Sequence, residues 1–194
     1  MQLLQAGLIL LSFLPLISTL LLGYQLLRNG QGAWGKPTIN KWVFFATKLA
    51  ITLLLAGPAV ASVFPNFFSY LPILIQSEIP DVQKLLALIF LLAGNLLLIP
   101  AYYTMSIFTR VGLPTRQHAL QTSGVYKISR NPMYASFIFF NTACFLLIPS
   151  MLITALIIFS LLAHHIIILR EEQFLTSTFQ QDYLNYKNQT ARYL

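Results

Sequence analysis

Residues 118–134 read HALQTSGVYKISRNPMY, the only long polar, basic and turn-forming run between apolar segments of this chain. The run contains Lys127 and Arg130, has Gly124 in its middle and ends on Asn131–Pro132. The segments before it, and nearly everything after it, are apolar enough to cross a membrane as helices. We therefore interpret the run as a loop at one membrane face, around which the rest of the chain is arranged.

The composition indicates an integral membrane protein. Of the 194 residues, 57% are hydrophobic and only 9% are charged, whereas about a quarter of a soluble domain is charged. The net charge of +7 could suggest a nucleic-acid partner, but the basic residues are spread over loops, as topology signals are. We expect no nucleic-acid partner. The single Cys144 excludes an intramolecular disulfide.

The apolar pattern predicts an all-α, polytopic fold in one membrane domain, residues 1–194. Three spans, at 3–27, 42–64 and 82–109, occupy residues 1–109, and a loop at 110–131 follows. Residues 132–169 form a helical hairpin of two further spans, 132–148 and 151–169, because only two residues separate them. The proline-broken region 65–80 is expected to be a loop with a short interfacial or re-entrant piece. In the tail, residues 170–194, one face of an amphipathic helix is marked by Leu175, Phe179, Tyr183 and Tyr186.

The distribution of Lys and Arg predicts the orientation. The loops after the first and third spans and the start of the tail are basic, whereas Glu78 and Asp81 make the loop after the second span acidic. Basic loops face the cytosol. We therefore expect the amino terminus outside and the carboxyl terminus in the cytosol, with the 118–134 loop on the cytosolic face.

Several residues of the loop suit the binding of a charged ligand. Gly124 permits a left-handed turn or a close backbone approach that a side chain would block. Asn131 is placed to cap the helix that starts at Pro132, and a helix amino terminus attracts a carboxylate or phosphate. The alternative is a plain capped loop whose basic residues face anionic lipid.

Two adjacent acids follow the last span. Glu171 and Glu172 each come seven residues after a histidine, His164 and His165, so each pair shares a helix face with a gap of about 10 Å. That gap suits a bound polar ligand or water. We predict no metal site, because adjacent histidines diverge by about 100° around a helix and do not readily hold one ion.

These motifs resemble those of the isoprenylcysteine carboxyl methyltransferase family and of related, phospholipid methyltransferase-like, membrane enzymes. The resemblance runs from about residue 118 to 186. It rests on an ordered set of residues: His118-x-Leu120, Gly124-x-Tyr126, Arg130-Asn131-Pro132-x-Tyr134, Glu171-Glu172, and then Phe179, Tyr183 and Tyr186. It implies several membrane helices, a cytosolic pocket for S-adenosylmethionine and a lipid entrance from the bilayer.

The resemblance also assigns residues. It implies that the cofactor is bound by His118, Leu120, Gly124, Tyr126, Asn131, Pro132, Tyr134, Glu171 and Glu172. The acids suit the amino group or ribose hydroxyls of the cofactor, and the loop N–H groups suit its carboxylate. The candidate catalytic residues are Glu171, Arg130 and Arg170. One of the two arginines would hold an acceptor carboxylate. Asn131 stands where methyltransferases acting on prenylated proteins usually have histidine.

The methyl acceptor stays open at this point, as a lipid-like or prenylated molecule. A carboxylate, as in isoprenylcysteine, needs no general base, whereas a phospholipid amine or a thiol must lose a proton, for which His118 or an acid is a candidate. Two other classes also remain. One is a nicotinamide-dependent membrane reductase, and the other is a non-enzymatic membrane protein whose polar loop only anchors its topology.

Overall fold

The computed structural model describes residues 2–30, 37–68, 78–105 and 119–194. The described residues form five α-helices and two short 3-10 helices, in the order α1 (Gln2–Arg28), α2 (Lys41–Val63), η1 (Pro65–Phe68), α3 (Asp81–Met105), η3 (Gly124–Lys127), α4 (Pro132–Leu147) and α5 (Met151–Gln189). Within these residues, β pairing is limited to a single bridge between Ser129 and Ala191. The all-α prediction is confirmed.

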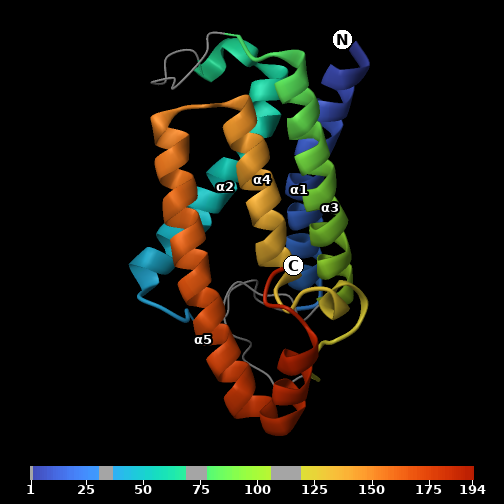
Figure 1. The fold of residues 1–194 in the computed structure, drawn as a ribbon, viewed down its shortest axis with the longest axis vertical. Coiled ribbons are helices and arrows are strands. Elements are labelled where there is room, and N and C mark those ends of the chain that lie inside the picture. The colour runs from blue at the N-terminus through green and yellow to red at the C-terminus, as the bar shows by residue number, and fades with distance from the viewer. Residues whose placement is uncertain (1, 31–36, 69–77, 106–118) are drawn as a thin grey trace.

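The helices run alternately along one bundle axis (Figure 1). Four of them, α1, α2, α3 and α5, are long and apolar enough to cross a membrane. The fifth, α4, is apolar and has 16 residues, which corresponds to about 24 Å. The protein is therefore a multi-pass membrane protein. The predicted sidedness of its termini stays a prediction.

The tight hairpin predicted between the last two spans is confirmed. Helix α4 ends at Leu147 and α5 begins at Met151, where the Ser150 side chain accepts a hydrogen bond from the Ile153 backbone N–H at 3.2 Å. This cap satisfies one amide of the first turn, which would otherwise lack a partner in an apolar environment.

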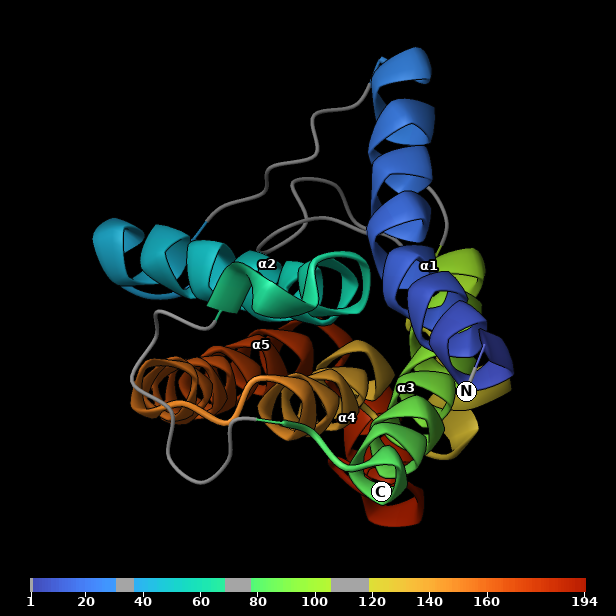
Figure 2. The same cartoon turned by 90° about the horizontal axis from the view of Figure 1, so that it is seen from above.

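Helices α3 and α4 pack closely at the centre of the bundle. Gly94 makes this approach possible, because a Cβ atom there would lie 2.8 Å from the Phe140 ring. The apolar core formed around this contact includes residues from all five helices, among them Leu8, Leu54, Leu91, Phe140 and Ile153. Viewed from above, α1 and α2 are inclined to the other three helices (Figure 2).

Helix α5 continues well beyond its apolar part, which ends at Leu169, and then reverses direction. Gln180 has φ 46° and ψ −118°, so the backbone turns there (Figure 1). The sequence pattern predicts one continuous amphipathic helix through this point, and that prediction is wrong. Tyr183 and Tyr186 are buried, with 1% and 8% of their surface exposed, because residues 181–194 fold back toward α4 and the loop. From here on, the tail means only the folded-back residues 181–194.

Three predicted regions fall partly outside the described residues, one of them the loop at 110–131, of which the structure describes only residues 119–131. The other two are the end of the third span beyond Met105 and most of the proline-rich region 65–80.

Candidate active site

The predicted site residues that the structure describes gather at the lower end of the bundle, as drawn in Figure 1, where α4 begins and the apolar part of α5 ends. His118 lies outside the described residues. Leu120 is partly buried, and Pro132 is buried at the start of α4.

Gly124 has φ +60°, which confirms the left-handed turn expected of a glycine at this position. A Cβ atom there would lie 3.2 Å from Thr104 Oγ1 of α3, so the position is also closely packed. L-residues other than Asn and Asp rarely adopt this backbone conformation. The turn directs the chain into η3, where Tyr126 is buried with 6% of its surface exposed.

Backbone and side-chain hydrogen bonds hold the tail against the loop. The Arg130 N–H donates to the Ala191 carbonyl at 2.9 Å, and the Tyr186 hydroxyl donates to the Tyr126 carbonyl at 2.6 Å. Asn131 donates its Nδ2–H to the Arg192 carbonyl at 3.1 Å. Asn131 precedes α4 but makes no side-chain cap, so the predicted capping role is wrong. Its amide group ties down the tail instead.

Glu172 is held between two arginines, and we call Arg130, Glu172 and Arg192 the tail clamp. Arg130 Nη2 lies 3.0 Å from Glu172 Oε1, and Arg192 Nη2 lies 2.9 Å from Oε2. The clamp lies beyond the apolar part of α5. Burial raises the pKa of Glu172, but hydrogen bonds from Arg192 and Arg130 outweigh this effect and leave the pKa below its ordinary value. Arg130 also donates to the carbonyls of Lys187 and Thr190.

Glu171 faces a different set of residues, and we call Lys48, Tyr134, His164 and Glu171 the buried cluster; His164 is buried and the other three are partly buried. The Tyr134 hydroxyl donates to Glu171 Oε1 at 2.9 Å. The Tyr134 ring lies 5.4 Å from the His164 ring, and Lys48 Nζ lies 5.6 Å from the Tyr134 ring centre. Burial raises the pKa of Glu171, although the Lys48 charge and the Tyr134 hydrogen bond oppose that shift.

Within the buried cluster, His164 of α5 lies next to Lys48 of α2. Its Nδ1 lies 2.8 Å from the Ser160 carbonyl, which can only accept, so Nδ1 carries the proton. Its Nε2 is then free to accept from Lys48 Nζ at 3.4 Å. The cluster thus joins three helices, α2, α4 and α5, through one carboxylate, one ammonium and two aromatic rings.

The spacing between the histidines and the acids does not leave the gaps that the sequence suggests. Tyr134 occupies the space between His164 and Glu171 and touches both. On the other face of α5, the hydroxyl of Tyr193 lies 2.7 Å from His165 Nδ1. Protein side chains therefore fill positions where a ligand or water was expected.

The structure does not bring Arg170 into either group. Its side chain is exposed and donates to Gln173 Oε1 at 3.3 Å. Arg130 is fully engaged by the tail clamp. Neither arginine is therefore arranged to hold an acceptor carboxylate.

Two residues of the site were missed from the sequence. Lys48 had a detectable signal, since an ionisable residue inside an apolar span is functional by default. Arg192 had none, because only the turn at Gln180 brings it to Glu172.

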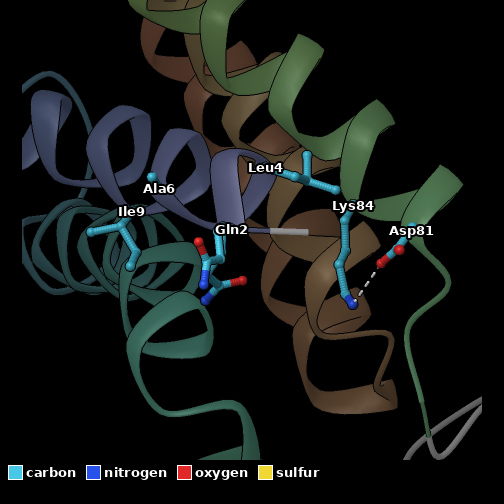
Figure 3. A pocket seen from close by; sticks show the side chains of 7 residues that line it. Gln2, Leu4, Ala6, Ile9, Asp81 and Lys84 are labelled. Carbon is cyan, nitrogen blue, oxygen red and sulfur yellow. Dashed lines mark hydrogen bonds and ion pairs between the residues drawn. The ribbon is translucent and has the colours of Figure 1, made fainter.

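A further cavity lies at the opposite end of the bundle. It has a volume of about 450 Å³ between the amino-terminal ends of α1 and α3 (Figure 3). Its charged residues, Asp81 and Lys84, form a partly exposed ion pair at 3.0 Å within one helical turn. Such exposed pairs contribute little energy. In the part of the chain that the structure describes, no group of three His, Cys, Asp or Glu side chains could hold a metal ion.

Comparison with known proteins identifies the family. The model of the phospholipid methyltransferase family matches residues 82–182, just over half of the chain. The match covers α3, η3, α4 and most of α5, and so includes Gly124, Tyr134 and both acids. A search of curated proteins finds no match. The family match supports methyl transfer and gives no support to the reductase and non-enzymatic alternatives. The chain belongs to the phospholipid methyltransferase family and is a multi-pass membrane methyltransferase.

Proposed function

We propose that this protein transfers a methyl group from S-adenosylmethionine to the amine head group of a phospholipid, with Glu171 as the acid at which the two reactants meet. One observation carries the proposal. Glu171 is a partly buried carboxylate that hydrogen-bonds to Tyr134 and, within the described residues, has no arginine partner. Both reactants carry a cationic group, so an acid without an arginine partner attracts those groups.

The residues around Glu171 fit the cofactor. S-adenosylmethionine supplies an electrophilic methyl group on a sulfonium and also carries an amino group, a carboxylate and ribose hydroxyls. Glu171 provides negative charge for the cationic groups. The first turn of α4 has no side-chain cap, which leaves backbone N–H donors for a carboxylate. The Tyr126 hydroxyl is buried and has no hydrogen-bond partner within the described residues, so it is available to a polar ligand.

The acceptor is oriented by charge in the same way. Lys48 supplies the one ammonium group of the buried cluster and would attract the phosphate of a phospholipid. The ammonium head group must lose a proton before its nitrogen can attack. Glu171 can accept that proton, because burial raises its pKa toward the working pH. The folded-back tail covers the loop and would limit water at the reacting groups.

A second acceptor is favoured by one observation. Lys48 could equally pair with the carboxylate of an isoprenylcysteine, which is already a nucleophile and needs no base. The motifs around residues 118–134 resemble those of enzymes with this activity. In this case Glu171 would serve the cofactor alone.

Transfer of a labelled methyl group tests the proposal. Protein reconstituted with phosphatidylethanolamine or with a farnesylcysteine should label the phospholipid when methyl-labelled S-adenosylmethionine is added. Glu171→Gln should lower the rate about 10- to 100-fold, since a hydrogen bond to a charged group contributes about 1.5–3 kcal/mol. Asp182→Asn removes an exposed carboxylate from the same helix and should leave the rate within about twofold. Label in farnesylcysteine alone would favour the second acceptor, and label in neither would contradict methyl transfer to these lipids.

A further inference from the structure

A pocket between α4 and α5 adjoins the buried cluster. It has a volume of about 210 Å³, and Tyr134 and His164 belong to its lining as well as to the cluster. Its rim includes Ile138 and Leu162, which are 41% and 63% exposed. In a membrane these rim residues face lipid, so a lipid could enter the pocket from the bilayer.

Asn141 lines this pocket without a hydrogen-bond partner. Its side chain is 2% exposed, and neither Nδ2 nor Oδ1 is hydrogen-bonded to any residue that the structure describes. An unpaired amide in an apolar environment is unfavourable. A ligand with hydrogen-bonding groups would remove that cost.

The position of Asn141 indicates where those groups lie in the ligand. It stands seven residues after Tyr134 on α4, so it lies about 10 Å further along the helix from the reacting end. The pocket holds about seven water-sized groups, if each takes about 30 Å³. It therefore accommodates a short linking region, while longer chains remain in the bilayer through the open rim.

We propose that this pocket binds the glycerol-ester region of a glycerophospholipid acceptor, with Asn141 Nδ2 donating to an ester carbonyl. The proposal rests on the proposed function, from which it takes the position of the head group. Ester carbonyls lie several bonds beyond the head-group amine, as the separation of Asn141 from Tyr134 requires. A prenyl chain has no donor or acceptor and would leave the Asn141 amide unpaired.

Lipid binding tests the inference without using activity. Native mass spectrometry would measure the dissociation constants of diester and diether phosphatidylethanolamine, which differ in the ester carbonyls. The parent should bind the diester about tenfold more tightly, since one hydrogen bond is lost with the diether. Asn141→Leu should remove this preference and should not lower the unfolding temperature. Thr142→Val, which removes a hydroxyl that bonds to the Ile138 carbonyl on the same helix, should keep the preference.

The outcomes separate the two proposals. Equal or absent binding of the two lipids by the parent, or a preference that survives in Asn141→Leu, overturns the assignment of this pocket. If the preference behaves as expected but phosphatidylethanolamine is not methylated, the pocket assignment stands and the proposed acceptor is wrong.

Discussion

Glu171 and Glu172 are neighbours in sequence, but the two regions that they enter are built differently. In the tail clamp, Glu172 is neutralised by Arg130 and Arg192, and its role is to fix the tail. In the buried cluster, Glu171 shares a hydrogen bond with Tyr134 and an electrostatic interaction with Lys48. The difference teaches that two adjacent acids of one motif can have different roles, one in stability and the other in binding. Substitutions in the two regions test that difference.

The largest expected effect is on stability, at the tail clamp. Glu172→Gln leaves the buried Arg130 without its charge partner, which should cost about 3–5 kcal/mol of folding free energy. Thermal unfolding in detergent, with trypsin cleavage at Lys187 as a second readout, would measure it. Asp81→Asn breaks the exposed ion pair with Lys84 and should cost less than about 1 kcal/mol. Equal losses in the two variants would contradict the clamp.

The next effect is on activity, at the buried cluster. Lys48→Met should lower kcat/KM for the lipid acceptor about 10- to 100-fold, because the charge that attracts the acceptor anion is removed. Stability should not fall, since methionine buries well where the ammonium group does not. A variant with parental kinetics would show that Lys48 does not serve the acceptor.

The pH dependence of stability should have opposite signs in the two regions. The pKa of Glu172 is lowered, so its contribution is present above the unfolded value, about 4.3, and is lost as the pH falls through the folded pKa. The pKa of Glu171 is raised, chiefly by burial, so the stability associated with its protonated form is lost as the pH rises through its folded pKa. Unfolding temperatures should be measured over a pH range that spans both folded pKa values. Over that range, Glu172→Gln and Glu171→Gln should change the pH dependence of the parent's unfolding temperature in opposite directions. If both variants change the pH dependence of the unfolding temperature in the same direction, the proposed difference between the two acids is wrong.

The smallest effect should come from Arg170, which lies in neither region. Arg170→Gln should change stability by less than about 0.5 kcal/mol and activity by less than about twofold. A large loss of activity would restore the catalytic role that the sequence suggests for Arg170.

The fold was largely predictable from the sequence because apolar length alone dictates membrane helices. The predicted spans at 3–27 and 42–64 differ by a residue at each end from α1 and α2. The hairpin followed from the lack of room between Ile148 and Met151, the predicted ends of the last two spans. The reversal at Gln180 was not predictable, because a positive φ at glutamine has no local sequence signal and depends on the packing of Tyr183 and Tyr186.

The sequence predicted several residues of the site but not how they are arranged. The motifs identified Tyr134, Glu171 and Glu172, but periodicity could not show that one acid would be bound by Arg192 from the tail. It also could not show that Tyr134 would fill the space between His164 and Glu171. Both facts depend on contacts between elements that are distant in sequence.

Calorimetric titration with S-adenosylmethionine tests the central claim, that Glu171 is the acid that meets the cofactor. Purified parent, Glu171→Gln and Asp182→Asn would be compared in detergent, since both substitutions remove one carboxylate from α5. Glu171→Gln should weaken binding about 10- to 100-fold, as expected for the loss of a charge-assisted hydrogen bond, and Asp182→Asn should remain within about twofold of the parent. An affinity of Glu171→Gln within twofold of the parent would contradict the claim.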